Sequence, residues 1–223
     1  MMLPSALRVG VTGHCALTDE ARVSRAVRTL IDDVNRTLDR QGTPLAWTIV
    51  SALAAGADCI VADAVLAQPD ARLEVITPLP LAEYRKDFTS PRDRDRFERL
   101  LRRAASVQEL GDDGGSAQAI ADGDRDAARD RAYLRVGQAV VRRCQLLIAI
   151  WNGRRAAGLG GTGDVVEDAL KEDRLVLWID ANEPERQVRV IRSIAYPAGD
   201  VANVVSDPLP LRLPVDGSGR IDR

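Results

Sequence analysis

The sequence predicts an α/β protein in which helices cover both faces of a doubly wound, mostly parallel sheet. Short apolar runs alternate along the chain with segments whose apolar residues recur at helical spacing. Most of these runs are continuous rather than interrupted by polar residues, as expected for strands that are buried on both faces. The length of 223 residues suits a single domain of this class.

The first two predicted elements carry the clearest signals. The apolar run "LRVGVTG", residues 7–13, predicts a buried strand that ends in a glycine turn. The apolar side chains between Val23 and Leu38 follow helical spacing, with Thr18 as the expected N-cap and acidic residues in the first turn. A strand followed at once by an amphipathic helix is the repeating unit of a parallel sheet.

The same unit recurs along most of the chain. The further predicted strands are residues 47–53, 72–80, 106–110, 146–151 and 175–180, and the further predicted helices are 56–68, 90–104, 124–143 and 162–173. Residues 111–124 are small and polar, and we expect a mobile surface loop there, as a lid or an insert. We therefore expect a Rossmann-like domain over residues 1–182 and a partly irregular C-terminal extension over residues 183–223, which ends in an extended tail.

Composition excludes several classes of protein. Basic and acidic residues nearly balance, at 31 and 33, so no field of one sign draws the chain to nucleic acid or anionic lipid. Cys15, Cys59 and Cys144 lie far apart and His14 is the one histidine, so neither a disulfide framework nor a metal site is expected. The apolar runs are of strand length, so no membrane helix is expected, and the first residues have no long apolar core, so we expect no signal peptide. We expect a soluble protein of the reducing bacterial cytoplasm, without membrane contact.

The loops that follow the strands are the segments to examine for function, because ligands of parallel α/β sheets bind beyond the carboxyl ends of the strands. Three of these loops, "GVTGHCAL", "SALAAGAD" and "NGRRAAGLGGTGD", combine glycine or other small residues with a hydroxyl next to a helix start. A helix N-terminus offers unpaired N–H groups, glycine admits a ligand closely, and a hydroxyl adds a donor. Such loops hold a phosphate without a lysine. Neither GxxxxGK[ST] nor GxGxxG is present.

Each of these loops taken alone is also typical of a tight or flexible turn. Their joint occurrence at successive strand ends is what favours a ligand site. The glycine-rich loop before residue 162 is then the expected phosphate cradle.

Five segments, in this order, resemble a known superfamily: "RVGVTGH", "SALAAGAD", "PLPLAEYRKDF", "AYLRVGQAVVRRCQLLIAIWNG" and "GGTGDVVEDAL". The set runs from about Arg8 to Asp180. It is similar to the SLOG superfamily, the Rossmann-like group named for the Smf/DprA and LOG proteins, and most of all to its stand-alone bacterial and defence-associated members.

The resemblance implies a nucleotide-like ligand over the carboxyl edge of the sheet. In that superfamily, LOG proteins cleave the N-glycosidic bond of nucleoside 5′-monophosphates, and SLOG domains of Thoeris defence effectors bind a cyclic ADP-ribose isomer. The related region of melastatin-type TRP channels binds ADP-ribose, and DprA proteins bind single-stranded DNA. The resemblance also implies a homo-oligomer, for which residues 124–143 are the expected pairing helix. A helix that only covers the sheet is the alternative.

The first departure from the superfamily's motifs concerns the phosphate's counter-charge. Relatives often carry an arginine directly after the Gly-His of the first loop, where this chain has Cys15. The cation has to come from elsewhere. The substitutes that the sequence offers are Arg154 and Arg155 after the fifth strand, or Arg129 and Arg131 before it.

The second departure concerns cleavage. In the LOG motif PGGxGTxxE the assisting glutamate follows the threonine by three residues, but here Val165 stands three residues after Thr162. Glu167 stands two residues further on, which is a rotation of about 200° on a helix. We expect Glu167 to point away from the place of that glutamate.

Three functions remain open from the sequence. In the first, the domain is a sensor that binds ADP-ribose, a cyclic relative or NAD. In the second, it is a phosphoribohydrolase, with Asp164 or Glu83 as the carboxylate and Arg129 or Arg154 as the cation, all of them weakly supported. In the third, it is a DNA-binding or scaffolding module, which the balanced charge disfavours. The register of the glutamate favours the sensor.

The expected ligand-binding residues lie directly after a strand or at the start of the next helix. They are Thr12, Gly13, His14, Ser51, Gly56, Asp58, Glu83, Tyr84, Asn152, Gly160, Gly161, Thr162, Gly163 and Asp164. A carboxylate among them would accept from ribose hydroxyls or an adenine amine, and Tyr84 or Tyr133 would stack on the base. No cofactor is expected.

Overall fold

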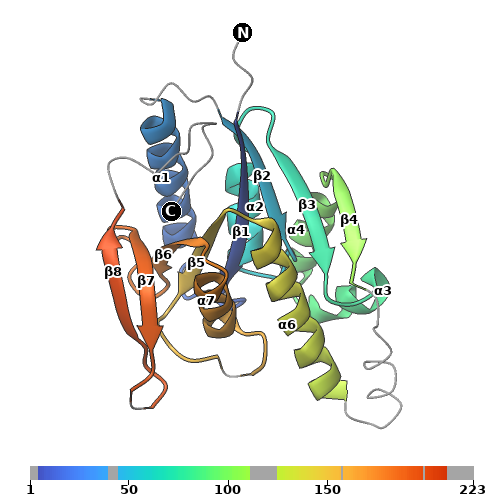
Figure 1. Ribbon diagram of the computed structural model, residues 1–223. Helices are drawn as coiled ribbons and strands as arrows, with labels where there is room; N and C mark the ends of the chain where they lie inside the picture. Colours follow the sequence, from blue (N-terminus) through green and yellow to red (C-terminus); the bar gives the residue numbers. More distant parts are fainter. Residues whose placement is uncertain (1–4, 40–44, 111–124, 157, 198, 210–223) are drawn as a thin grey trace.

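The computed structural model describes residues 5–39, 45–110, 125–156, 158–197 and 199–209 (Figure 1). The strands are β1 (Ser5–Gly13), β2 (Leu45–Ser51), β3 (Arg72–Thr77), β4 (Ser106–Glu109), β5 (Leu146–Trp151), β6 (Leu175–Asp180), β7 (Arg189–Ala195) and β8 (Asn203–Pro208). The helices are α1 (Glu20–Asp39), α2 (Ala57–Val65), α3 (Leu81–Tyr84), the 3₁₀ turn η1 (Arg85–Asp87), α4 (Pro91–Leu101), α6 (Arg125–Arg143) and α7 (Thr162–Lys171).

All eight strands belong to one sheet in the order β4-β3-β2-β1-β5-β6-β7-β8. The strands from β4 to β6 pair in parallel, and β7 and β8 are antiparallel to their neighbours. This confirms the predicted α/β class with a Rossmann-like, mostly parallel sheet. The chain builds outward from β1 to β4 and then returns to place β5 on the other side of β1. The loops after β1 and β5 therefore diverge, and such a switch point is where ligands enter this architecture.

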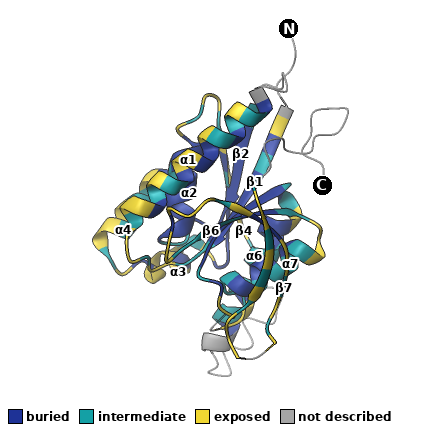
Figure 2. Ribbon diagram, turned by 90° about the vertical axis from the view of Figure 1, so that its left-hand side faces the viewer, coloured by how far each residue is buried: buried dark blue, intermediate teal, exposed yellow. Residues whose placement is uncertain are grey.

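The sheet is the middle of three layers. α1, α2 and α4 cover one face, while α6 and α7 cover the other (Figure 2). Alternate side chains of β5 pack on opposite faces of the sheet. Leu146, Ile148 and Ile150 pack against the first layer of helices, and the residues that alternate with them pack against the second. All of β5 is buried, so every position of this strand is apolar.

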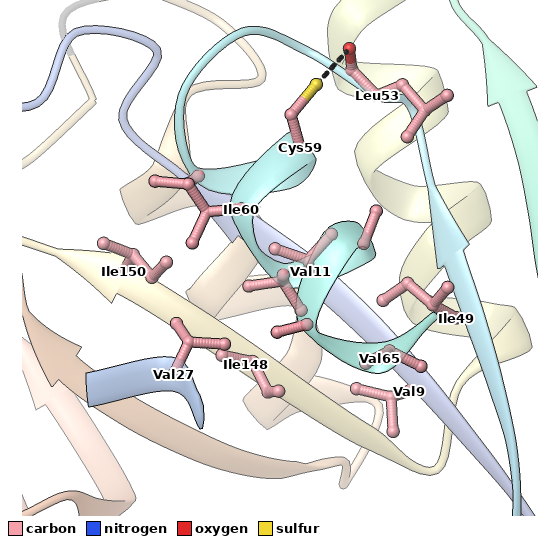
Figure 3. Close-up of a cluster of buried hydrophobic side chains, with 14 of the residues drawn as sticks. Val9, Val11, Val27, Ile49, Leu53, Cys59, Ile60, Val65, Ile148 and Ile150 are labelled. Atoms are coloured by element: carbon pink, nitrogen blue, oxygen red, sulfur yellow. Dashed lines mark hydrogen bonds between the residues drawn. The ribbon is translucent and has the colours of Figure 1, made fainter. Parts of the chain in front are cut away.

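The core under α2 fixes the end of β2. Figure 3 shows Ile60 and Val65 of this helix packed among the valines and isoleucines of β1, β2 and β5. Each such side chain contributes about 1.5–3 kcal/mol when fully buried. The Cys59 thiol donates to the carbonyl oxygen of Leu53 at 3.5 Å, and burial raises the pKa of this thiol. Cys59 is thus a packing residue that holds the short connection from β2 to α2.

The N-cap of α1 is Asp19, and the prediction of Thr18 is wrong. The Oδ1 atom of Asp19 accepts a hydrogen bond from the backbone N–H of Arg22 at 3.0 Å. That N–H belongs to the third residue of the helix, which is the donor that an N-cap side chain reaches. Thr18 lies one residue too far from the first turn.

Two features were absent from the sequence prediction. Residues 81–87 form α3 and η1, where the prediction had only a proline-terminated strand end. β7 and β8 lie within the predicted extension 183–223, so the sheet continues across the boundary placed after residue 182. The predicted loop 111–124 and the final residues 210–223 lie outside the described residues. In the part of the chain that is described, no helix combines the length and the apolar character needed to cross a membrane.

Candidate functional site

A cavity of about 510 Å³ lies at the switch point between β1 and β5. Its walls are the residues after β1, the start of α2, one side of α6, the loop after β5 and the first turn of α7. The volume falls within the range of about 300–1,000 Å³ that is typical of small-molecule sites. Two other hollows border α1, but neither includes a residue that directly follows β1 or β5.

Most of the expected ligand-binding residues meet in this cavity. Those that line it are Thr12, Gly13, His14, Asp58, Asn152, Gly160, Gly161, Thr162 and Gly163. Those outside its lining are Ser51, Gly56, Glu83, Tyr84 and Asp164. The residues brought together come from the strand-end loops of β1, β2 and β5, as the topology requires.

His14 joins three of the walls. Its Nε2 atom accepts a hydrogen bond from the backbone N–H of Asn152 at 3.1 Å, and its carbonyl oxygen accepts one from the N–H of Ala57 at 3.1 Å. Burial lowers the pKa of His14. An imidazole whose Nε2 is an acceptor is neutral and carries its proton on Nδ1. The hydrogen bonds of His14 therefore hold the ends of β1 and β5 and the start of α2 together.

Gly56 serves the packing of this loop. It adopts φ +72°, and a Cβ at this position would lie 2.4 Å from the carbonyl oxygen of Cys15. Only glycine allows the loop after β1 to pass so close to the start of α2. Gly56 thus shapes the cavity without lining it.

Asp58 contributes a carboxylate to the cavity wall. Only 5% of it is exposed, and its Oδ2 atom accepts a hydrogen bond from the Ser51 hydroxyl at 2.8 Å. Ser51 also accepts from the N–H of Leu53 at 2.8 Å, so it is fully used inside the protein. Burial raises the pKa of Asp58 to about 6, against the opposing effect of Ser51 and nearby backbone N–H groups. Asp58 is the member of this pair that reaches the ligand space.

Tyr133, rather than Tyr84, is the tyrosine of the cavity. Tyr84 is 1% exposed and packs edge-on against Phe88, Phe97 and Tyr133, with ring centroids 5.3, 5.7 and 6.3 Å away. It therefore has no face free for a base. Tyr133 lines the cavity, and its hydroxyl donates to the carboxylate of Asp87.

Two of the weakly supported catalytic groups are engaged elsewhere. Glu83 is exposed and accepts from the Lys86 ammonium at 2.5 Å. Arg129 forms an ion pair with Asp87 and does not line the cavity. Asp87 thus ties η1 to α6, because it receives both Arg129 and the Tyr133 hydroxyl.

The glycine loop before α7 forms another part of the cavity wall. Gly160 adopts φ +78°, and a Cβ there would lie 2.3 Å from the backbone nitrogen of Leu134. Asp164, the third residue of α7, reaches back so that its Oδ2 atom accepts from the N–H of Gly160 at 3.0 Å. This capping contact explains why Asp164 does not face the ligand space.

The first turn of α7 has two backbone N–H groups without a partner in the described part of the chain. Gly161 is its N-cap residue, and the first helical hydrogen bond runs from the N–H of Val165 to the carbonyl oxygen of Gly161 at 3.2 Å. Among the described residues, no acceptor is found for the backbone N–H groups of Thr162 and Gly163. These groups, with the positive end of the helix dipole, are suited to an anion.

α7 directs no carboxylate into the cavity. Val165 is 4% exposed and lines the wall. Glu167 lies outside the lining and pairs with Lys171 at 3.6 Å. Of the described acidic residues, Asp58 and Asp130 line the cavity.

Arg154 and Arg155 supply positive charge to the cavity wall. Both are exposed, and neither takes part in an ion pair among the described residues. Their backbone is held by Trp151, whose indole N–H donates to the carbonyl oxygen of Arg154 at 2.7 Å. Of the four arginines that the sequence offered as substitutes for Cys15, these two stand at the cavity.

The contribution of α6 was missed from the sequence, apart from Tyr133. Asp130, Tyr133, Gly137 and Val140 line one side of the cavity. Their spacing of three, four and three residues places them on one face of a helix. That stripe was the signal that could have assigned this wall.

No metal-binding group of three or more side chains occurs in the described part of the chain. The sequence matches no family model and no curated protein. Any functional assignment therefore depends on the geometry of the cavity and on the sequence motifs around it.

Proposed function

We propose that the protein binds a nucleotide-derived ligand in this cavity and acts as a sensor of it. The observation that carries the proposal is the set of polar groups that line the cavity. It combines Arg154, Arg155 and the first turn of α7 with the carboxylates of Asp58 and Asp130 and the ring of Tyr133. A nucleotide matches such a set, because its phosphates are anionic while its sugar and base offer hydrogen-bond donors and a flat face.

The ligand class that fits best has phosphate at one end and a nucleoside at the other. ADP-ribose, a cyclic relative or NAD meets this requirement. Phosphate oxygens would accept from the first turn of α7, and a ribose hydroxyl or exocyclic amine would donate to Asp58. Tyr133 would pack against the base or sugar.

We also propose membership of the SLOG superfamily. The support is the order of the five motifs along the chain, together with the position of the strand-end loops around one cavity. Pairing of two copies along α6 belongs to the same proposal. Light scattering coupled to size-exclusion chromatography tests it, with a dimer as the expected result and a monomer at all concentrations as the contradicting one.

Phosphoribohydrolase activity has less support than sensing. Cleavage of the LOG type needs a carboxylate at the place of that motif's glutamate, three residues after the threonine. At the position of the LOG glutamate the wall is the apolar side chain of Val165, and Asp164 is committed to the N–H of Gly160. We therefore expect binding without turnover.

The test combines a binding measurement with a turnover measurement on the same protein. Thermal shift and calorimetry with ADP-ribose, cyclic ADP-ribose, NAD and AMP should give a rise in melting temperature for at least one ligand. The double variant Arg154→Gln/Arg155→Gln should weaken that binding roughly tenfold or more, since each arginine contributes a charge-assisted contact. Arg131→Gln is the matched control, because Arg131 is exposed on α6 and does not line the cavity.

Incubation with AMP at high protein concentration, followed by chromatography for free adenine, should show no product. Release of adenine would contradict the sensor proposal and would show that the protein is a phosphoribohydrolase. If the double variant binds the ligand as tightly as the wild type does, the ligand does not bind in this cavity.

A further inference from the structure

The connection between β7 and β8 packs on the loop that carries the two arginines of the cavity. The backbone N–H of Arg155 donates to the carbonyl oxygen of Asp200 at 2.6 Å, and the N–H of Ala202 donates to the carbonyl oxygen of Gly153 at 2.7 Å. Arg154 and Val201 form an isolated antiparallel bridge. The C-terminal hairpin and the loop after β5 are therefore one structural unit.

Tyr196, the residue after β7, lies between Arg155 and α7. The guanidinium carbon of Arg155 lies 4.2 Å from the centre of the Tyr196 ring. The Tyr196 hydroxyl is buried, has no partner among the described residues, and lies 3.0 Å from where a Cβ of Gly163 would be. Its ring thus connects the arginine to the first turn of the helix.

Stacking on an aromatic face restricts an arginine without using its N–H donors. The planar guanidinium keeps its five donors free for an anion while the ring holds its plane. A long side chain that is already ordered loses less conformational entropy when a ligand binds. Arg155 is therefore ordered beforehand and still available to a ligand.

The acidic groups near this place do not neutralise Arg155. Burial raises the pKa of Tyr196, the charges of Glu167 and Asp164 raise it further, and the charge of Arg155 opposes them. Asp164 is directed to the N–H of Gly160, and Glu167 pairs with Lys171. The positive charge of Arg155 remains at the cavity wall.

We propose that Tyr196 is a positioning residue that holds Arg155 over the start of α7 for a phosphate monoester or diphosphate. The C-terminal hairpin, which lies outside the segment that resembles SLOG proteins, is then part of the ligand site. This inference rests on the proposed function, in that it takes the anion to be the phosphate of the nucleotide. It adds that phosphate recognition depends on a residue beyond the Rossmann-like core.

The experiment compares ligands with and without phosphate in two Tyr196 variants. Calorimetry measures AMP, ADP-ribose, cyclic ADP-ribose, NAD, adenosine and inorganic pyrophosphate on wild type, Tyr196→Phe and Tyr196→Leu. Tyr196→Phe keeps the ring and removes only the unpartnered hydroxyl, so its affinities should stay within about twofold of wild type. Tyr196→Leu should lower the affinity for phosphate-bearing ligands roughly five- to tenfold and leave adenosine unchanged.

Arg155→Gln, alone and combined with Tyr196→Leu, separates positioning from folding. If Tyr196 acts through Arg155, the double variant binds phosphate no more weakly than Arg155→Gln alone. A merely structural role would instead lower the affinity for adenosine as well and would add to the loss in the double variant. Unfolding in urea of every variant shows whether the hairpin is still folded.

The outcomes distinguish this inference from the proposed function. If wild type binds AMP or ADP-ribose and Tyr196→Leu binds them equally well, the inference fails and the proposed function stands. If wild type binds pyrophosphate but no nucleotide, the proposed function fails, and the pyrophosphate affinity of Tyr196→Leu decides the inference. If wild type binds none of the phosphate-bearing probes, both are overturned.

Discussion

The imidazole of His14 and the backbone of Asn152 are joined by a 3.1 Å hydrogen bond in which Nε2 is the acceptor. This contact spans the switch point, because His14 follows β1 and Asn152 follows β5. An imidazolium has no acceptor nitrogen, so the contact exists only while His14 is neutral. The wall of the cavity is thus coupled to the protonation of one side chain.

The first prediction is that His14 titrates below its ordinary pKa of 6.5, since burial disfavours the charged ring. The unfolded chain then binds more protons than the folded one, so stability is present above pH 6.5 and declines as the pH falls below it. His14 is the one histidine of the chain, so tag-free protein gives a single imidazole spectrum by NMR. We expect the Nδ1–H tautomer. A pKa above 6.5 or an Nε2–H tautomer would contradict the hydrogen bond.

The second prediction concerns Asp58, whose pKa burial raises to about 6. Between the ordinary carboxyl pKa of 3.8 and about pH 6, the folded state then holds a proton that the unfolded state has lost. Stability therefore falls as the pH rises through this window, by about 3 kcal/mol for a shift of about two units. Asp58→Asn should lack this fall, because an amide oxygen still accepts from Ser51 without being charged. Urea unfolding between pH 4 and pH 7 measures the difference.

Asp32→Asn is the control for Asp58→Asn, because Asp32 is exposed on α1. Its stability should fall with rising pH between pH 4 and pH 7 as much as that of the wild type. Parallel stability curves for wild type and Asp58→Asn would show that Asp58 is not the buried group described here.

The third prediction compares two glycines of positive φ in the loop after β5. Gly153 and Gly160 adopt φ +74° and +78°, and only Gly160 has a neighbour within Cβ contact, the backbone nitrogen of Leu134. Alanine at either position costs about 1–2 kcal/mol for the left-handed backbone. Gly160→Ala should lower the free energy of unfolding clearly more than Gly153→Ala, because α6 has to move away from the added Cβ. Equal losses in urea unfolding would mean that the loop does not pack on α6.

The fourth prediction is that Tyr84→Phe does not lower stability. The Tyr84 hydroxyl is buried and has no hydrogen-bond partner among the described residues. Removing an unsatisfied buried hydroxyl is neutral or stabilising, by up to about 1 kcal/mol. Tyr84→Ala, which also removes the ring from its contacts with Phe88 and Phe97, should cost about 3–5 kcal/mol.

The Tyr84→Phe measurement has two readouts. Chemical unfolding gives the stability, and ligand affinity should be unchanged because Tyr84 does not line the cavity. A loss of more than 1 kcal/mol would reveal a hydrogen-bond partner for the hydroxyl.

The fold was predictable from the sequence where a strand is buried on both faces, because burial then requires apolar residues at every position. β5 occupies the predicted residues 146–151 because both of its faces are covered, which makes the whole run apolar. β7 was not predicted, because it lies near the edge of the sheet and keeps four exposed or half-exposed positions beyond Ile191. Its pairing with β6 depends on contacts that no local pattern encodes.

The candidate site shows the same division. Loops placed after β1, β2 and β5 met at one cavity because parallel strands end at the same edge. Ser51 and Asp164 also lie at a strand end or at a helix start, but neither lines the cavity. The Ser51 hydroxyl bonds to Asp58, and the Asp164 carboxylate bonds to the N–H of Gly160. Side-chain direction within a loop is set by such contacts, and position in the chain does not reveal it.

The sequence by itself determined the α/β class, the order of the strands from β1 to β6 with the longer helices between them, and the strand ends at which a ligand can approach, since these follow from apolar periodicity and glycine placement. Tertiary structure decided which polar groups remain available there. It assigned Arg129 to Asp87 and left Arg155 on the ring of Tyr196, a residue 41 positions further along the chain. The physical reason is that long charged side chains find partners across the surface, and those partners are set by packing between distant segments.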